Sequence, residues 1–190
     1  CKRAGIRVVM ATGDHYLTGK AIANQIGIVN TMDEWVYTGE EVDQMDDQEL
    51  DEVMVKANAF ARVSPEHKHR LVNSLQRLGH VVAMTGDGVN DAPALQAAEI
   101  GIAMGITGTD VTKETAEMVL TDDNFNSIVN AVEEGRVVFS NVRKVVKFLL
   151  ATNAGEILTL VAALVIFASD GLIISPVQIL WVNLVTDGIL

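Results

Sequence analysis

The sequence predicts an α/β domain with a partial, doubly wound parallel sheet, which continues into a transmembrane α-helical hairpin. Three observations lead to this expectation. Short apolar runs alternate with helix-like segments over residues 1–123. Two of these runs end in the same tripeptide, Thr-Gly-Asp, at residues 12–14 and 85–87. From residue 148 the chain is mostly apolar over roughly 20 residues, which is enough to cross a bilayer.

Composition supports a polar part joined to a very apolar part. Among 190 residues, 14 Lys and Arg stand against 25 Asp and Glu, for a net charge of −11, and this acidity argues against a nucleic-acid partner. The mean hydropathy of +0.27 is high for so acidic a chain. The single cysteine, Cys1, excludes an internal disulfide. Without an initiating Met or a signal-peptide pattern, we expect the sequence to begin inside a longer protein.

The first predicted unit is a strand over residues 5–11, a short loop and a helix over residues 17–26. The loop carries Thr12, Gly13 and Asp14. Taken alone, Thr-Gly-Asp is a common turn. Two such loops in one α/β chain are stronger evidence, because parallel strands place their carboxyl ends along one crevice.

The next segment, residues 33–52, is acidic, and we interpret it as a solvated face. A strand is expected over residues 57–63 and a helix over residues 67–78, preceded by an N-cap Ser64 and a Pro at the first helical position. Lys68 then lies in the first turn, where a cation opposes the helix dipole, so an anionic partner would explain it. The alternative is an ordinary solvent-exposed lysine. His67 and His69 are expected at the surface rather than as metal ligands.

The most informative stretch is residues 84–95, Met-Thr-Gly-Asp-Gly-Val-Asn-Asp-Ala-Pro-Ala-Leu. It follows an apolar run over residues 80–84 and leads into a helix-forming run over residues 92–98. Such a loop brings backbone N–H groups and a helix N-terminus to one point, which suits phosphate. Asp87 and Asp91 would repel phosphate unless a hard cation such as Mg²⁺ lay between, and Asp87 is the better ligand. Asp91 is better placed to hold the loop. The alternative is a tight turn without chemistry.

The remaining elements complete the expected sheet. Residues 100–104 are predicted as a strand, residues 105–109 as a flexible loop, residues 110–117 as a helix and residues 118–120 as a last strand. Strands and helices alternating in this way give a parallel sheet with helices on both faces.

From residue 124 the pattern becomes helical, and a basic cluster precedes the apolar segment 148–167. The cluster consists of Arg136, Arg143, Lys144 and Lys147. Positive charge at this position is typical of the cytoplasmic side of a membrane span. We therefore divide the chain into a cytosolic domain over residues 1–123, a stalk helix over 124–147 and a transmembrane part over 148–190. The alternative for the apolar segment is a buried core helix.

Polar residues inside the apolar part point to an ion path. Asn153 and Glu156 lie at i and i+3 on one helix face, and a carboxylate in hydrocarbon usually marks an ion path or proton relay. Beyond the polar turn 169–171, Asn183, Thr186 and Asp187 share a face in a second apolar segment, which is too short past residue 176 to span a membrane. Two carboxylates, two amide oxygens and a hydroxyl would together suit a hard, divalent cation.

Four of these motifs resemble the P-type cation-transporting ATPases. Thr85-Gly-Asp-Gly-Val-Asn-Asp-Ala-Pro-Ala-Leu95 is similar to the hinge motif of their phosphorylation domain, which has a haloacid-dehalogenase-like fold. Phe60-Ala-Arg-Val-Ser-Pro-Glu-His-Lys68 matches a second motif. Asn153-Ala-Gly-Glu156 and Val182-Asn-Leu-Val-Thr-Asp-Gly188 look like the fifth and sixth transmembrane helices of calcium pumps of the sarcoplasmic-reticulum type. Asn183 and Thr186 fit the sodium–potassium and secretory-pathway calcium/manganese branches less well.

The resemblance implies part of an ATP-driven pump that works through a phosphoenzyme intermediate, most simply for Ca²⁺. Roles are carried over by motif. Thr12, Gly13 and Lys68 would hold the phosphoryl group, and Asp87 would hold Mg²⁺. The other implied catalytic residues are Asp14, Asn90 and Asp91, and Arg62 is an implied cofactor-binding residue. The transported cation would be held by Asn153, Glu156, Asn183, Thr186 and Asp187.

The resemblance also shows what this sequence lacks. The Asp-Lys-Thr-Gly-Thr motif of the phosphorylated aspartate is absent, so no nucleophile can be named, and we expect the isolated chain to be inactive. Its partners would be the lipid bilayer and the missing domains of the same pump, which bind most of the ATP. The expected localisation is a multi-pass membrane protein with residues 1–147 cytosolic. Alternatives are a pump for Mn²⁺ or Na⁺, a soluble haloacid-dehalogenase-like phosphatase, or a fragment that binds without turnover.

Overall fold

The structure, a computed structural model, describes residues 1–29, 36–166 and 175–188. It divides the chain into two compact units, Cys1–Val129 and Asn130–Leu190. Each unit is described by itself below. The side chains of residues 176 and 186–188 lie outside the description.

The first unit contains six short parallel strands. β1 (Met10–Ala11), β2 (Val36–Thr38) and β3 (Ala59–Ala61) form one sheet in the order β1-β3-β2. β4 (Ala83–Gly86), β5 (Ile100–Met104) and β6 (Met118–Leu120) form another in the order β4-β5-β6. The parallel α/β arrangement confirms the predicted fold class. The described strands pair as two sheets, however, with β1 and β4 at sheet edges, whereas one sheet was expected.

In chain order, the helices of the first unit are η1 (Lys2–Ala4), α1 (Tyr16–Gln25), α2 (Gly39–Gln44), α3 (Asp47–Lys56), α4 (Pro65–Arg77), η2 (Val89–Asp91), α5 (Ala92–Ala97) and α6 (Asp110–Thr115). Four of them, α1, α4, α5 and α6, begin and end within two residues of the predicted positions, whereas η1, α2, α3 and η2 were not predicted. The acidic stretch was only partly a solvated face. It contains β2 and two helices, and α2 and α3 bury Val42, Leu50 and Met54 in the core.

β3 is the central strand of its sheet, paired with β1 on one side and β2 on the other, and both of its faces are covered. Phe60 is fully buried in a cluster with Leu50, Met54 and Leu71 from α3 and α4. Ala59 and Ala61 point the other way, into a cluster with Ala23 of α1. Side chains alternate along a strand, so a strand buried on both sides becomes apolar throughout. Its carboxyl end leads directly into α4.

The start of α4 follows the predicted N-cap. The Ser64 hydroxyl accepts from the His67 backbone N–H, and His67 Nδ1 accepts from the Ser64 N–H at 3.0 Å, which closes a capping box. His67 Nε2 lies 2.7 Å from Asp43 Oδ1, and the residue is only 8% exposed. The prediction that His67 is a surface residue was therefore wrong, because its ring caps α4 against α2.

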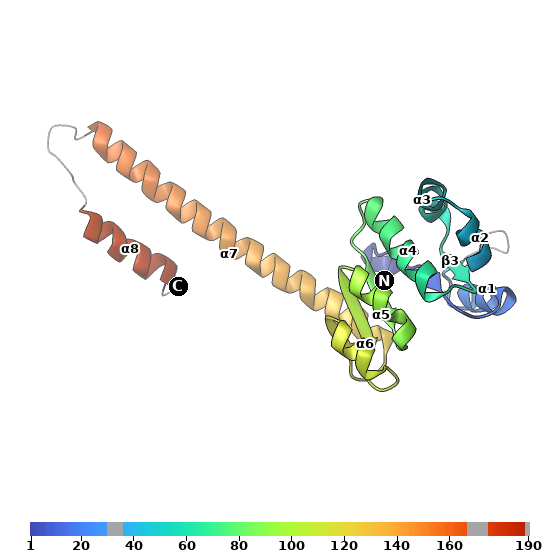
Figure 1. The fold of residues 1–190 in the computed structure, drawn as a ribbon. Helices are drawn as coiled ribbons and strands as arrows, with labels where there is room; N and C mark the ends of the chain where they lie inside the picture. The colour runs from blue at the N-terminus through green and yellow to red at the C-terminus, as the bar shows by residue number, and fades with distance from the viewer. Residues whose placement is uncertain (30–35, 167–174, 189–190) are drawn as a thin grey trace. The chain divides into compact units, whose positions relative to one another are not determined.

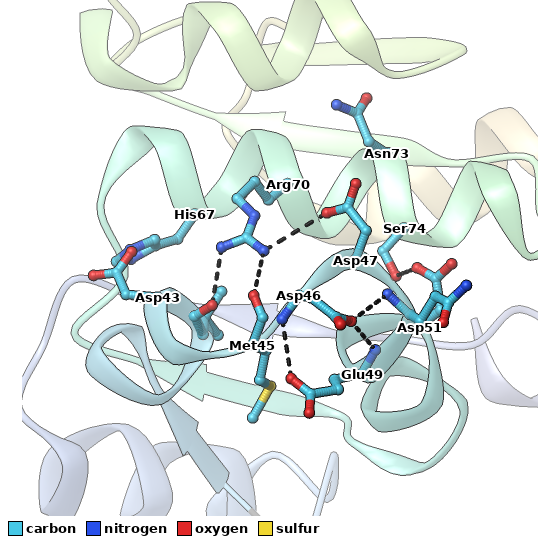
Figure 2. A network of polar contacts seen from close by, with 12 residues as sticks. Asp43, Met45, Asp46, Asp47, Glu49, Asp51, His67, Arg70, Asn73 and Ser74 are labelled. Atoms are coloured by element: carbon cyan, nitrogen blue, oxygen red, sulfur yellow. Dashed lines mark hydrogen bonds and ion pairs between the residues drawn. The ribbon is translucent and has the colours of Figure 1, made fainter.

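A polar network fixes α4 against α2 and α3 (Figure 2). The Arg70 guanidinium donates to the carbonyls of Val42 and Met45, both at 2.9 Å, at the end of α2. It also forms an ion pair with Asp47 in the first turn of α3. Farther along α4, Arg77 and the Ser74 hydroxyl hold Asp51. α4 is thereby held by backbone carbonyls at the end of α2 and by carboxylates of α3.

The second unit is dominated by α7 (Phe125–Ile166), a single unbroken helix of 42 residues that begins in the first unit (Figure 1). It contains both the predicted stalk and the apolar segment. By length and composition it can cross a membrane, and none of its most apolar stretch is buried within the described residues. α8 (Pro176–Gly188) follows. The predicted turn at 169–171 lies outside the described residues.

Candidate functional site

The Thr12–Asp14 loop at the end of β1 is held against the chain that leaves β3. The Thr12 hydroxyl donates to Asp14 Oδ2 at 2.8 Å, and the Asp14 N–H donates back to that hydroxyl at 3.1 Å. The backbone N–H groups of Arg62 and Val63 donate to the carbonyls of Asp14 and Thr12, at 2.9 and 3.1 Å. Two predicted site segments therefore meet at the carboxyl ends of adjacent parallel strands.

Arg62 occupies an unusual backbone conformation at this edge. Its φ is 53°, in the left-handed region that side chains other than glycine rarely adopt. Such strain persists only when surrounding contacts impose it, and it is frequent at functional sites. The contact of its N–H with Asp14 is one such restraint. Its side chain is half exposed and lies 3.8 Å from Glu40.

The second part of the site joins α4 to the loop after β4. Lys68 Nζ donates to Asp91 Oδ1 at 2.5 Å, with side-chain exposures of 19% and 7%. The other oxygen of Asp91 accepts the backbone N–H groups of Asp87 and Gly88, both at 3.3 Å. One buried carboxylate thus holds both the lysine and the loop. Asp87 and Asn90 remain exposed on it.

Gly86, the last residue of β4, is required by this close approach. A Cβ at Gly86 would lie 2.5 Å from the Cβ of Asp91. Because real Cβ atoms do not come so near, any side chain here would displace Asp91 and its contacts with Lys68 and the loop. The first glycine of the Gly-Asp-Gly pattern therefore has a packing reason that is independent of any bound group.

The donor set around Asp87 fits a magnesium ion that is shared with a phosphate. Within the described ranges no three acidic, histidine or cysteine side chains converge as a ready metal site. Mg²⁺ usually keeps several waters and takes one or two protein carboxylates together with substrate phosphates. The exposed carboxylate of Asp87, on a loop that also presents backbone N–H groups, suits a magnesium ion that takes only part of its ligands from the protein. Zinc or calcium cages need more protein ligands.

In the second unit the structure brings together two of the five predicted cation ligands. With the side-chain nitrogen of Asn183 turned toward Glu156, it donates to both carboxylate oxygens at 2.6 Å. Glu156 is half-buried. Asn153 Nδ2 instead donates to the Leu149 carbonyl of its own helix at 2.9 Å. The side chains of Thr186 and Asp187 lie outside the described residues.

Sequence reasoning missed contributors that lie outside the motif loops. Thr109 donates its backbone N–H to the carbonyl of Asp87 at 3.0 Å, and Asp123 holds the loop that contains Thr109. An acid next to Asn124 is a signal that a helix begins there, and this signal could have drawn attention to Asp123. No sequence signal indicates the contact of Asp123 with residues 106 and 107, because that contact depends on where β5 and β6 end in space.

Comparisons with known proteins agree with this architecture. Residues 1–99 match a family described as haloacid dehalogenase-like hydrolase, and residues 68–132 match a second family of the same description. The chain belongs to the haloacid dehalogenase-like hydrolases. Its similarity to P-type ATPases over its whole length places it, more narrowly, among these proteins, as one part of such a protein.

Three similar proteins illustrate that similarity. A calcium-transporting ATPase of Bacillus cereus is 54% identical over 187 residues, which is 98% of this chain and 21% of the relative. A P-type sodium-transporting ATPase of Toxoplasma gondii is 51% identical over 199 residues, covering 99% of this chain and 15% of the relative. The crystal structure of a zinc-transporting PIB-type ATPase is similar with a TM-score of 0.66 and 31% identity, over 85% of this chain and 22% of that one. The chain thus spans about a fifth of the length of curated relatives.

Proposed function

We propose that this chain is part of an ATP-driven Ca²⁺ pump that works through a phosphoenzyme intermediate. It would supply the magnesium and phosphate pocket and part of the ion site. The observation that carries the proposal is the pairing of Glu156 with Asn183, which brings two predicted cation ligands from α7 and α8 to within 2.6 Å. The calcium-transporting relative supports Ca²⁺ as the cargo, and the sodium-transporting relative makes Na⁺ the alternative to be tested.

In the proposed mechanism the first unit binds and orients a phosphoryl group. Lys68 provides positive charge, which stabilises the charge of a transferring phosphoryl group, while Thr12 and Gly13 offer a hydroxyl and a backbone N–H. Asp87 would hold Mg²⁺, which neutralises phosphate oxygens when bound. Asp91 keeps the ammonium of Lys68 and the loop amides in fixed positions. The other implied site residues lie just after the ends of strands: Asp14 after β1, Arg62 after β3 and Asn90 after β4.

The aspartate that becomes phosphorylated would come from the missing part of the same pump. Among the described strands, β1 pairs only with β3 and β4 only with β5, so each leaves one edge free. Unpaired edges carry backbone donors and acceptors that another strand can satisfy. Exposed apolar side chains lie close by in sequence, with Val81 81% exposed and Leu17 68% exposed. We infer that a segment absent from this chain completes these edges.

The second unit would carry the cation path. Carboxylates inside a membrane are costly unless they pair or bind a cation, and Glu156 already faces the amide of Asn183. With Asn153, Thr186 and Asp187 the set would give oxygen ligands of the kind Ca²⁺ prefers. α7 continues without a break from the first unit to Glu156, so it can transmit a movement at the phosphate pocket. The intact protein would be multi-pass, with residues 1–147 cytosolic.

The first prediction concerns calcium dependence in the full-length pump. Glu156→Gln keeps the shape of the side chain but removes a charge, and Asp187→Asn does the same in α8. Each should raise the Ca²⁺ concentration for half-maximal ATP hydrolysis at least about tenfold, corresponding to about 1.4 kcal/mol. Glu133→Gln, on the exposed surface of α7, is the matched control and should leave it unchanged.

The same assay distinguishes Ca²⁺ from Na⁺ as the transported ion. Activation of the unaltered pump by Na⁺ without Ca²⁺ would replace calcium with sodium as the transported ion. Unchanged Ca²⁺ affinity in both Glu156→Gln and Asp187→Asn would remove these residues from the ion site.

A further inference from the structure

Asp123 accepts three hydrogen bonds from the loop that follows β5. Its Oδ1 accepts the Ile106 N–H at 3.0 Å, and its Oδ2 accepts the N–H and the hydroxyl of Thr107, both at 2.8 Å. These bonds, with the Ile106 N–H foremost, lower the pKa of Asp123 to about 2. The side chain therefore stays a carboxylate and an acceptor throughout the physiological range.

The backbone of Asp123 is strained in a way that serves this contact. Its φ is 49°, a left-handed conformation in a residue other than glycine. The Asp123 N–H donates to the Leu120 carbonyl at 3.2 Å, and the Gly105 N–H donates to the same oxygen at 2.8 Å. A Cβ at Gly105 would lie 2.5 Å from that oxygen. The chain after β6 is thus turned tightly against the chain after β5.

The far end of the loop, residues 105–109, reaches the proposed magnesium ligand. The Thr109 N–H donates to the backbone carbonyl of Asp87 at 3.0 Å. The Thr109 hydroxyl accepts from the Thr112 N–H and so caps α6. The loop is therefore held at one end by Asp123 and at the other by Asp87, and α6 makes the second attachment rigid.

Asp122, the neighbour of Asp123, fixes the beginning of α7. Its Oδ1 accepts the Asn124 N–H at 3.1 Å, and its Oδ2 accepts the Ser127 hydroxyl at 2.8 Å. Two successive acids therefore point to different partners. Asp122 binds the first turn of the long helix, and Asp123 binds the loop that supports Asp87.

We propose that Asp123 is a positioning residue of the phosphate pocket, which acts through Thr109 on the backbone of Asp87, while its neighbour Asp122 holds the first turn of α7. The inference rests on the proposed function, because it gives Asp87 the magnesium. Asp123 itself touches no reacting group. Its loss would let the Asp87 loop move, which weakens Mg²⁺ binding and slows phosphoryl transfer, because small misplacements at a reacting centre are costly. The cation site would keep its own affinity.

The test uses the full-length pump with phosphorylation by labelled ATP as the readout. Asp123→Asn tolerates the left-handed backbone but replaces one acceptor oxygen with a donor that faces the donors of Thr107. We expect the Mg²⁺ concentration for half-maximal phosphorylation to rise between about threefold and about tenfold. Ca²⁺ binding measured without ATP should be unchanged. Glu114→Gln, an exposed acid of α6, is the control of equal charge change and should alter neither quantity.

A double-mutant cycle separates positioning from a general structural role. Thr109→Pro removes the N–H that reaches Asp87, together with the hydroxyl that caps α6, and the φ of Thr109, −72°, already suits proline. If Asp123 acts through Thr109, Asp123→Asn should add little to the Mg²⁺ requirement of Thr109→Pro. Thr107→Val removes only one of the three bonds and should give a smaller rise in the same direction, which covers the case in which Asp123→Asn fails to accumulate.

Three results would overturn the inference: an unchanged Mg²⁺ requirement in stable Asp123→Asn, an unchanged requirement in Thr107→Val, or fully additive effects in the cycle. Failure of the proposed function has a different signature. In that case Asp87→Asn itself would phosphorylate normally at low Mg²⁺. The inference alone fails if Asp87→Asn is impaired while the Asp123 and Thr107 variants behave like the unaltered pump.

Discussion

At the scale of single residues, the pairing of Lys68 with Asp91 changes how the lysine is understood. The sequence left a choice between a phosphate-neutralising group and an exposed lysine. The side chain is 19% exposed and its Nζ lies 2.5 Å from a carboxylate that is itself 7% exposed. The exposed alternative is therefore wrong. Lys68 has a structural partner already, and an incoming phosphate would have to share the ammonium with Asp91.

Because Lys68 has a structural partner as well as a proposed chemical role, two variants should separate its effect on the free energy of unfolding from its effect on phosphorylation. Lys68→Met strands a buried carboxylate, which should cost about 3–5 kcal/mol of unfolding free energy. Adding Asp91→Asn removes that charge, so the double variant should recover most of the loss. Phosphorylation by ATP should remain absent in both. Denaturant unfolding in detergent and a phosphorylation assay of the full-length pump measure the two effects. Recovery of phosphorylation in the double variant would contradict a chemical role for Lys68.

At the scale of elements, α4 connects the two parts of the proposed pocket. Its N-cap follows β3, its first turn carries Lys68, and its later turns are held by ion pairs with α3. The basic residues of α4 face acids that the sequence presents as a solvated run. Because those acids bind Arg70 and Arg77, the acidic stretch helps to set the position of the lysine.

The Asp51–Arg77 contact gives a pH dependence that can be measured. The Arg77 guanidinium, followed by the Ser74 hydroxyl, lowers the pKa of Asp51 below its ordinary value of 3.8. A lowered folded-state pKa stabilises the fold above the unfolded-state value and loses that effect as the pH falls through the folded-state value. Asp51→Asn should therefore destabilise the chain at pH 7, and the difference should shrink below about pH 4.

Chemical unfolding of both forms at a series of pH values checks this expectation. The neighbouring Glu52→Gln, an exposed acid on the same helix, serves as the control. A difference between Asp51→Asn and the unaltered chain that is constant from pH 7 to pH 3 would show that the ion pair does not carry the effect.

At the scale of the whole molecule, α7 is the element that favours a membrane protein, by its length and apolar composition. A soluble phosphatase would bury its apolar stretch, and within the described residues that stretch is uncovered. We expect the 190-residue chain, expressed alone, to remain with membranes after an alkaline carbonate wash. It should show no ATP turnover, because the nucleophile is missing. Release as a soluble monomer would favour the buried-helix alternative, and ATP turnover would contradict a partial catalytic site.

Local sequence signals predicted much of the fold. Ser64 and Pro65 marked the start of α4, and β5 and β6 were predicted with their observed bounds. The misses came from contacts between distant segments. β2 was missed because it is only three residues long, Val-Tyr-Thr, and lies within a segment whose acidic composition favours a solvated face. His67 looks like a surface histidine until α2 brings Asp43 to 2.7 Å.

What the sequence determined by itself was the chemistry available: a Gly-rich acidic loop, a lysine in a first turn, and carboxylates inside apolar helices. These follow from residue type and spacing, which are local. Only the tertiary structure decided that Asp91 neutralises Lys68, that Asn183 meets Glu156, and that Asp123 supports the loop behind Asp87. Hydrogen bonds and ion pairs form between groups within about 3 Å, and only the packing of strands and helices brings distant residues so close.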